Sequence, residues 1–410
     1  MSDRQPYVVV DTLYLWHLGN PAKPLLVGDL HWRPSHRCVA LQYDAAWIKS
    51  GFALSDDLPL IAEMQLARDK DCAPGAVDDA RPDRWGERVI RHLDPPPRFS
   101  VLEMLYFTGD ERFGALSVST SRTVYLPRHG AALPTLGDMD DLHALVQKVI
   151  AGEPIDEAHR RLISPGATMG GARPKALIQI DGLPWIVKFA EEARADEAAV
   201  EHAAMTLAAL ADIEVAETRL ISFKTGVALA VKRFDRARGA RRDAISANVA
   251  LKAAHVDLSY PNLAQLLRRR GPTENDHNRQ QMRELFRRLV FNILIDNTDD
   301  HEKNHALLLT PAHEYVLSPA FDVLPTGQAL GQQAMEVGVE GSASTLVNAA
   351  SRAAAYGLRK EEVKAEIRKV AQVVGDWQAH FSRAGVQAAT IRSLAAQIDR
   401  PFLAQQRARN

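Results

Sequence analysis

The sequence has 410 residues, of which 46% are hydrophobic and 25% charged, and its formal net charge at pH 7 is −1. This size and balance are typical of a globular protein with two or three domain-sized parts. A protein that binds nucleic acid by itself usually carries a basic excess, so this composition gives no reason to expect one. Arginines gather around Arg233–Arg242 and at Arg268–Arg270, and we interpret both clusters as solvated surface.

The two cysteines, Cys38 and Cys72, are too few for a disulfide framework or a four-thiolate zinc site, which fits a reduced compartment. The N-terminal residues lack the basic start and apolar stretch of a signal peptide. No run of about 18 apolar residues is present, so no transmembrane helix is expected. We therefore expect a cytoplasmic protein with no membrane partner.

The N-terminal third is expected to be rich in β-structure. Residues 7–55 hold two strand-like runs, Tyr7–Tyr14 and Arg37–Tyr43, with Gly and Pro turn signals between them. Asp83 is a candidate N-cap for a helix that follows it. Residues 124–137 include Pro127, Gly130 and Pro134, which is typical of a linker.

The middle of the chain alternates short strands with helices. In chain order, the patterns predict a helix over residues 138–152, a glycine-rich loop over residues 164–175, a hairpin of Ala176–Ile180 and Trp185–Phe189, a helix over Asp196–Ala211, and strands at Thr218–Phe223 and Val227–Val231.

Beyond residue 240 the chain is expected to be mostly helical. Apolar residues have helical spacing over Leu285–Ile295, and residues 344–410 hold several amphipathic helices, one of them Lys360–Val374. Between these regions, Ala306–Leu309 and Tyr315–Leu317 predict a β-hairpin.

The order of these parts is that of a protein kinase, in which a small β-rich lobe precedes a larger helical lobe. Phosphoryl transfer requires phosphates held in place, a positioned Mg²⁺ and an oriented acceptor hydroxyl. A glycine-rich loop lets backbone N–H groups approach phosphate oxygens, and Gly170, Gly171 and Lys175 are the candidates here. The strict P-loop pattern is not met, because Ala172 stands where a lysine should follow the second glycine.

Lys188 lies in the apolar run Ile186-Val187-Lys188-Phe189, the setting of the kinase lysine that pairs with the α- and β-phosphates. From this run alone, a strand lysine that faces solvent is the favoured interpretation. A glutamate on the following helix could hold this lysine as an ion pair. Glu201 and Glu197 are equal candidates, and we favour a solvated helix position for Glu201.

The segment after residue 296 carries the strongest signal. Asp299 and Asn304 have the five-residue spacing of a kinase catalytic loop, in which the Asp accepts the substrate hydroxyl proton and the Asn binds Mg²⁺. Asp322 follows the next hairpin, where the second Mg²⁺ ligand is expected, and Mg²⁺ prefers such oxygen ligands. The same residues could instead be turn residues that cap backbone N–H groups.

The overlapping sequence His301-Glu302-Lys303-Asn304-His305 matches the zinc protease pattern H-E-x-x-H. On a helix the two histidines would share one face and bind zinc, with Glu302 as the base. The motif runs directly into a predicted strand and no convincing third ligand follows, so we favour the kinase interpretation.

Taken together, these segments resemble the HipA family, the serine/threonine kinase toxins of type II toxin–antitoxin pairs. The resemblance covers most of the chain and rests on six segments: Phe113–Ser117, Gly170–Lys175, Ile186–Lys188, Val231–Arg236, Asn297–Asn304 and Leu317–Asp322.

The resemblance implies roles for particular residues. Asp299 would be catalytic, Asn304 and Asp322 would bind Mg²⁺, Gly170, Gly171 and Lys188 would contact ATP, and the backbone of Lys232 and Phe234 would meet the adenine. Many relatives autophosphorylate a serine in the glycine-rich loop. The matching position here holds Thr168, with Ser164 nearby, and this departure leaves such regulation open.

The resemblance also implies partners: a small helix-turn-helix antitoxin of the HipB type, DNA only through the antitoxin complex, and a protein substrate such as an aminoacyl-tRNA synthetase. The expected fold is α+β, with an N-terminal β-rich domain (residues 1–130), a kinase-like small lobe (131–236) and a helical lobe (237–410). A zinc metalloprotease and a degenerate, non-catalytic kinase that only binds an antitoxin remain the alternatives.

Overall fold

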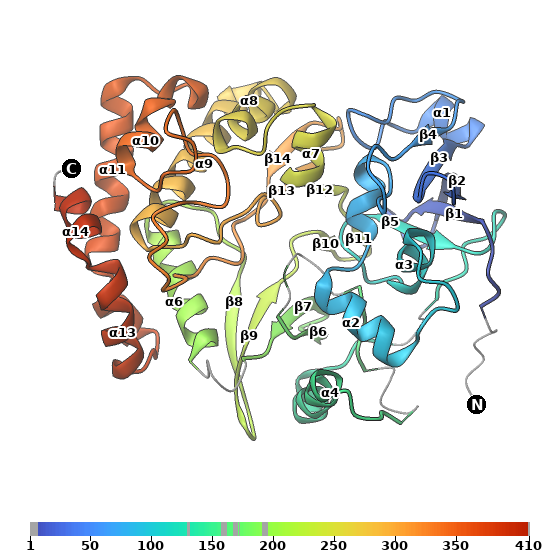
Figure 1. Cartoon of the computed structure of the whole chain (residues 1–410), viewed down its shortest axis with the longest axis horizontal. Coiled ribbons are helices and arrows are strands. Elements are labelled where there is room, and N and C mark those ends of the chain that lie inside the picture. The colour runs from blue at the N-terminus through green and yellow to red at the C-terminus, as the bar shows by residue number, and fades with distance from the viewer. Residues whose placement is uncertain are drawn as a thin grey trace. The chain divides into compact units, whose positions relative to one another are not determined.

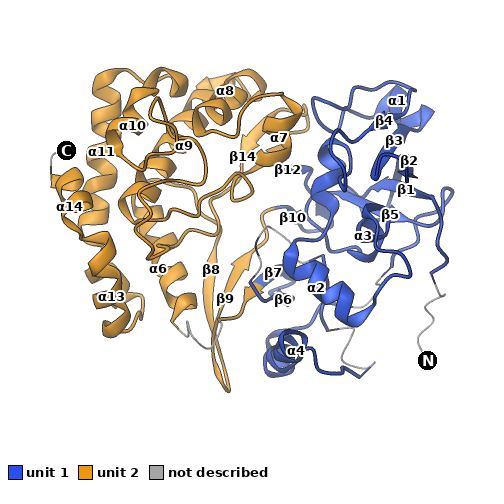
Figure 2. Cartoon of the chain, in the orientation of Figure 1, with its two compact units in different colours: residues 1–186, 235–245 blue, residues 187–234, 246–410 orange. Residues whose placement is uncertain are grey.

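The computed structural model describes residues 7–128, 132–156, 162–166, 171, 173–190 and 196–408. The chain forms two compact units, each made of two sequence segments (Figures 1 and 2). Unit 1 comprises residues 1–186 and 235–245, and unit 2 comprises residues 187–234 and 246–410. Each unit is described separately.

Unit 1 is built on a five-stranded antiparallel sheet with strand order β4-β3-β2-β1-β5. Its strands are β1 (Thr12–His17), β2 (Leu25–Arg33), β3 (Cys38–Tyr43), β4 (Gln65–Leu66) and β5 (Leu116–Ser119). Leu13, Leu15, Val27 and Leu30 are fully buried, so the alternating apolar residues of the strands form the core of this unit.

Short helices complete unit 1. They are α1 (Ala45–Ser50), α2 (Arg84–Leu93), α3 (Val101–Phe107) and α4 (Met139–Ala151), with 3₁₀ turns η1 (Gly75–Ala80) and η2 (Leu136–Asp138). The side chain of Asp83 accepts a hydrogen bond from the backbone N–H of Gly86, which confirms the expected helix cap.

The predicted hairpin after the glycine-rich segment is present as β6 (Lys175–Ile180) and β7 (Leu183–Lys188), which are neighbours in one sheet. Asp181 and Gly182 between them have φ angles of +54° and +78°, the left-handed values that a tight two-residue hairpin turn requires. The chain passes from unit 1 to unit 2 within β7. It returns to unit 1 for the short strands β10 (Arg236–Ala237) and β11 (Ala240–Arg241), and crosses again within β12 (Ala244–Ser246).

Unit 2 contains two antiparallel strand pairs and most of the helices. The strands are β8 (Thr218–Phe223), β9 (Gly226–Lys232), β13 (Ala306–Leu309) and β14 (Tyr315–Leu317). The helices are α6 (Glu197–Leu210), α7 (Ala247–Ala253), α8 (Tyr260–Arg270), α9 (His277–Leu294), α10 (Leu346–Ser351), α11 (Lys360–Gly375), α12 (Trp377–Arg383), α13 (Ala388–Ile398) and α14 (Pro401–Ala408), with 3₁₀ turns η4 (Glu274–Asp276) and η5 (Ala353–Tyr356).

Helix α9 is the central helix of unit 2. Leu285, Phe286, Leu289 and Ile293 have no exposed surface, and α9 packs against α8 and α11 (Figure 1). A helix covered by neighbours in this way holds its C-terminal end in a fixed place. The loop with the strongest functional signal begins at that end.

One expectation about surface charge was wrong in part. Arg268–Arg270 are exposed, as expected, but Arg233 is 4% exposed and Arg236 is paired with Asp235. The first arginine cluster is therefore partly structural. Among the residues that the structure describes, no helix is both long and apolar enough to cross a membrane.

Candidate active site

Lys188, the last residue of β7, joins two acidic side chains of unit 2. Its Nζ donates to Glu201 Oε1 and to Asp322 Oδ1, at 2.6 Å in each case. Burial lowers the pKa of Lys188, but the two carboxylates raise it by more, so that the net shift is upward. The lysine therefore stays charged and holds an acidic residue of a helix and one of a loop together.

Glu201 lies on α6 and is 1% exposed. The expectation of a solvated helix position for this residue was wrong. Alanine-rich α6 packs against β8 and β9, and small side chains allow a helix to approach a sheet closely. The glutamate thereby reaches the lysine, whereas the equal candidate Glu197 lies in the first turn of the helix.

Asp322 follows β14 in a left-handed backbone conformation, with φ of +59°. Asp is one of the few non-glycine residues that adopts this region readily. The preceding residues fix its position: the Ala320 N–H donates to Glu214 O at 2.7 Å, and the Phe321 ring packs on Phe234 at 5.4 Å. The carboxylate that meets Lys188 is thus held by the local fold.

The loop after α9 carries Asp299 and Asn304. Asp299 is exposed, while Asn304 is buried and donates from Nδ2 to the backbone O of Asp299 at 3.2 Å. The Oδ1 atom of Asn304 is buried and has no hydrogen-bond partner among the residues that the structure describes. A buried amide oxygen without a partner is energetically costly, and it is also the type of oxygen that Mg²⁺ binds. The Asp322 carboxylate is also an oxygen donor of the type that Mg²⁺ prefers.

Asp300, the next residue, is 3% exposed. Its Oδ2 accepts hydrogen bonds from Tyr260 OH, from Asn292 Nδ2 at 2.8 Å and from His305 Nε2 at 2.9 Å. Burial raises the pKa of Asp300, but the nearby His305 and these hydrogen bonds lower it by more, so its pKa lies below the usual value of 3.8. The buried group is therefore a carboxylate.

The zinc protease pattern does not lie on a helix. Residues 301–305 form a turn that leads into β13. The Nδ1 of His301 accepts from the Lys303 N–H, and His305 Nε2 faces Asp300. The two histidines therefore do not share a helix face, and no cluster of three or more His, Cys, Asp or Glu side chains suited to a metal occurs within the described part of the chain.

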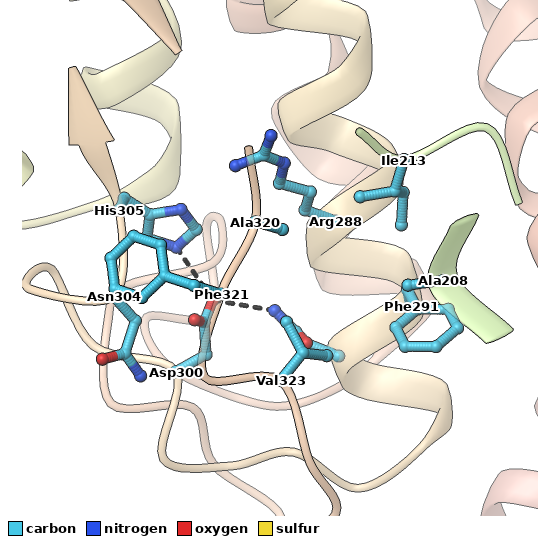
Figure 3. Close-up of a pocket in the computed structure, with 11 residues that line it drawn as sticks. Ala208, Ile213, Arg288, Phe291, Asp300, Asn304, His305, Ala320, Phe321 and Val323 are labelled. Carbon is cyan, nitrogen blue, oxygen red and sulfur yellow. Dashed lines mark hydrogen bonds and ion pairs between the residues drawn. The ribbon is translucent and has the colours of Figure 1, made fainter. Parts of the chain in front are cut away.

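A small cavity lies behind this loop (Figure 3). It has room for about one water molecule, so it is not a nucleotide site. Its lining includes Arg288, Asn304, His305 and Phe321, and therefore the segments before Asp322 and around Asn304 meet there. Arg288 also donates to Ser318 O at 2.7 Å, which secures the end of β14.

The glycine-rich segment is described in part. Gly171 has a φ of +103°, a conformation that side chains rarely adopt. Lys175, an expected phosphate contact, is 2% exposed and its Nζ contacts Asp83 Oδ2 at 2.7 Å. Ser164 is half-buried. Gly170 and Thr168 lie outside the described residues.

The two residues expected to meet adenine are Lys232, the last residue of strand β9, and Phe234, which follows two positions later. The backbone N–H of Lys232 donates to Glu217 O, and its Nζ donates to Glu217 Oε2, both at 2.9 Å. Phe234 stacks obliquely on Phe321, so it lies beside the residue that precedes Asp322. Their proposed contact with adenine stays a prediction.

Sequence reasoning missed Asp300 and its three partners. Tyr260 and Asn292 lie on two different helices, and no local pattern marks their convergence on one oxygen. The doubled acid Asp299-Asp300 is the one local signal that the sequence offers.

Two family models and a solved structure match this chain. Residues 167–377 match the model of the HipA-like C-terminal domain, and residues 22–119 match that of the HipA N-terminal domain. The HipA protein of Shewanella oneidensis, solved with HipB and operator DNA, has a TM-score of 0.67 and 18% identity, and the match covers 97% of each chain. A candidate kinase of Sinorhizobium fredii, Y4dM, is 32% identical over 158 residues, which are 35% of this chain and 38% of that protein.

The domain matches together cover the N-terminal sheet and the loop, lysine and acidic residues of the site. The solved relative has the same overall fold, with β-rich N-terminal parts and a helical C-terminal region. The chain belongs to the HipA family.

Proposed function

We propose that this protein is a serine/threonine protein kinase of the HipA type that transfers the γ-phosphoryl group of Mg-ATP to a cellular protein. The observation that carries the proposal is the double contact of Lys188 with Glu201 and Asp322, at 2.6 Å each. A strand lysine between a helix glutamate and a metal-binding aspartate is the arrangement that protein kinases require for activity.

Each residue has a task in this proposal. Asn304 Oδ1 and the Asp322 carboxylate would hold Mg²⁺, which neutralises charge on the phosphates during transfer. Lys188 positions the nucleotide phosphates. The exposed Asp299 carboxylate accepts the proton of the acceptor hydroxyl, and its backbone is held by the hydrogen bond from Asn304.

The partners follow from the family. The related Shewanella protein was solved with HipB and operator DNA, and we infer that this chain likewise pairs with a helix-turn-helix antitoxin and reaches DNA through it. Its net charge of −1 agrees with DNA contact made chiefly by the partner. An aminoacyl-tRNA synthetase is one candidate for the substrate.

Phosphorylation at Thr168 or Ser164 would place negative charge beside the ATP phosphates and lower activity, which phosphate mapping by mass spectrometry would test.

The test is phosphate transfer from radiolabelled ATP, with Mg²⁺, to the protein itself and to a cell lysate. We expect Asp299→Gln to abolish transfer without loss of folding, because the carboxylate that accepts the proton is gone. Glu302→Gln is the matched control in the same loop and should retain transfer, since its backbone O, and not its side chain, contacts Asn248.

The two alternatives predict other outcomes. A metalloprotease would lose its activity in Glu302→Gln and would contain stoichiometric zinc. A degenerate kinase would bind ATP without turnover. Phosphate transfer by Asp299→Gln at the wild-type rate would contradict the proposed role of Asp299.

A further inference from the structure

Asp299 and Asp300 are neighbours with opposite environments. Asp299 is exposed, whereas Asp300 is 3% exposed and is surrounded by hydrogen-bond donors. The donors to its Oδ2 come from α8 (Tyr260), from α9 (Asn292) and from the residue before β13 (His305). Figure 3 shows the contact with His305 beside the small cavity. One buried oxygen therefore connects three elements of unit 2.

Further hydrogen bonds extend from this centre along the loop. The amide of Asn292 is used at both ends, because its Nδ2 donates to Asp300 and its Oδ1 accepts from Asn297 Nδ2 at 3.1 Å. At the other end of the loop, Asn304 Nδ2 donates to Asp299 O at 3.2 Å. The start, middle and end of the loop are thus each held by side chains.

We propose that Asp300 is the positioning residue of the catalytic loop, and that it sets where Asp299 and Asn304 lie relative to each other. The inference rests on the proposed function, since it takes Asp299 as the proton acceptor and Asn304 as an Mg²⁺ ligand. Charge-assisted hydrogen bonds are stronger than neutral ones, and a fully satisfied buried network makes its surroundings rigid. A solvent-exposed aspartate on an irregular loop needs such a support to stay in one place.

The chemistry requires a carboxylate at this position. Asn292 Nδ2 donates to Asp300, because the Oδ1 of Asn292 already accepts from Asn297. His305 Nε2 donates as well, since a carboxylate oxygen can only accept. In Asp300→Asn, the amide oxygen can take the place of Oδ2 and face the same three donors. The substitution keeps the size of the side chain but removes its negative charge, so the hydrogen bonds lose their charge assistance and hold the loop less firmly.

The test compares Asp300→Asn with a buried carboxylate elsewhere in the same unit. Glu366 on α11 is 4% exposed and pairs with Arg283 and Arg287, so Glu366→Gln makes the same chemical change away from the loop. We expect Asp300→Asn to lower kcat on the order of 100-fold, the effect of a misplacement of about 1 Å. The KM for ATP should change little, because Lys188 and Asp322 keep their contacts. Glu366→Gln should keep the wild-type kcat below its melting temperature.

A second readout does not depend on activity. Hydrogen–deuterium exchange of peptides that cover residues 296–305 should become faster in Asp300→Asn and stay unchanged in Glu366→Gln. Unchanged exchange and unchanged kcat in Asp300→Asn would overturn the proposal, as would an equal loss of kcat in both variants. If the wild-type protein transfers no phosphate, the kinase function fails, while the exchange result still decides the role of Asp300.

If Asp300→Asn does not fold, Tyr260→Phe keeps the carboxylate and removes one donor. An intermediate decrease in kcat with faster exchange of residues 296–305 then supports the proposal, and wild-type values of both overturn it.

Discussion

Lys188 carries a charge on which a buried neighbour depends, because Glu201 beside it is 1% exposed. Lys188→Met would leave a buried carboxylate without its ammonium partner. Such a loss costs about 3–5 kcal/mol for fully buried pairs. We expect the free energy of unfolding, measured by urea denaturation, to fall by about 3 kcal/mol, since the Lys188 side chain is 14% exposed.

A double-mutant cycle gives the control for this prediction. In Lys188→Met Glu201→Gln both charges are absent, so the loss of stability should be smaller than the sum of the two single losses. Additive losses would mean that the lysine and the glutamate do not stabilise each other.

For single residues, the sequence indicated the candidate reacting groups but not the side chains that hold them in place. The spacing of Asp299 and Asn304 is local, so it could be recognised from a pattern. The convergence of Tyr260 on Asp300 joins residues 40 positions apart, and no local pattern encodes such a contact. The choice between Glu197 and Glu201 failed for the same reason, because it depends on how close α6 comes to Lys188.

Among the elements, α6 is notable for its attachment to the C-terminal helices. Thr206 Oγ1 contacts His380 Nε2 of α12 at 2.9 Å, Asp212 after α6 pairs with Lys369 of α11, and Asp196 before α6 accepts from the N–H of Gln387 at 2.9 Å. Since α6 carries Glu201, the C-terminal helices support the position of a site residue.

Two histidines at this junction predict a pH dependence. Burial lowers the pKa of His202 and of His380 from 6.5, and Arg383 lowers that of His380 further. A group whose folded-state pKa is depressed contributes stability that is present above its unfolded pKa and is lost as the pH falls through the folded pKa. We therefore expect the midpoint temperature of thermal unfolding to decrease as the pH is lowered from about 7 to about 5.5.

Scanning calorimetry of His202→Gln His380→Gln would check this origin. The midpoint temperature of the double variant should decrease less over the same pH range, because glutamine does not titrate. An identical fall in the variant and the wild type would assign the pH dependence to other groups.

Elements with a clear local pattern were predicted well. Strand β8 and the hairpin of β13 and β14 span the predicted residues, since apolar runs and turn signals determine them. Strand β1 begins at Thr12 and not at Tyr7, and Val8 before it is 72% exposed. Strand β2 was missed because Gly28 suggested a turn, whereas a Cβ at Gly28 would lie 2.2 Å from the backbone O of Gln42 in the neighbouring strand.

At the scale of the whole molecule, both compact units are discontinuous in sequence. Contacts between distant segments therefore determine each unit, and a single sequence does not reveal them. Lys188 and Asp322 are 134 residues apart, yet their side chains are in contact, and the order of motifs had predicted that both belong to one site. The domain limits at residues 130 and 236 stay a prediction.

Within unit 1, an ion pair of Asp83 and Lys175 connects the N-terminal segment to the strand that follows the glycine-rich segment. The side chains are 8% and 3% exposed and meet at 2.7 Å, and Trp85 Nε1 donates to Lys175 O at 2.8 Å. Asp83→Asn keeps an oxygen to cap α2 but removes the charge. The buried lysine then loses this carboxylate, and we expect the free energy of unfolding to fall by about 3–5 kcal/mol.

Asp71→Asn provides the contrast, since the pair of Asp71 and Arg37 has the same separation of 2.7 Å but side chains that are 57% and 64% exposed. Exposed pairs contribute about 0–1 kcal/mol, so this variant should differ little from the wild type in urea unfolding. Lys175→Met Asp83→Asn should be more stable than Asp83→Asn alone, because the buried ammonium that lost its carboxylate is also removed. If Asp83→Asn and Asp71→Asn unfold at the same urea concentration, burial does not strengthen the Asp83–Lys175 pair. In that case apolar packing holds the segments around Asp83 and Lys175 together.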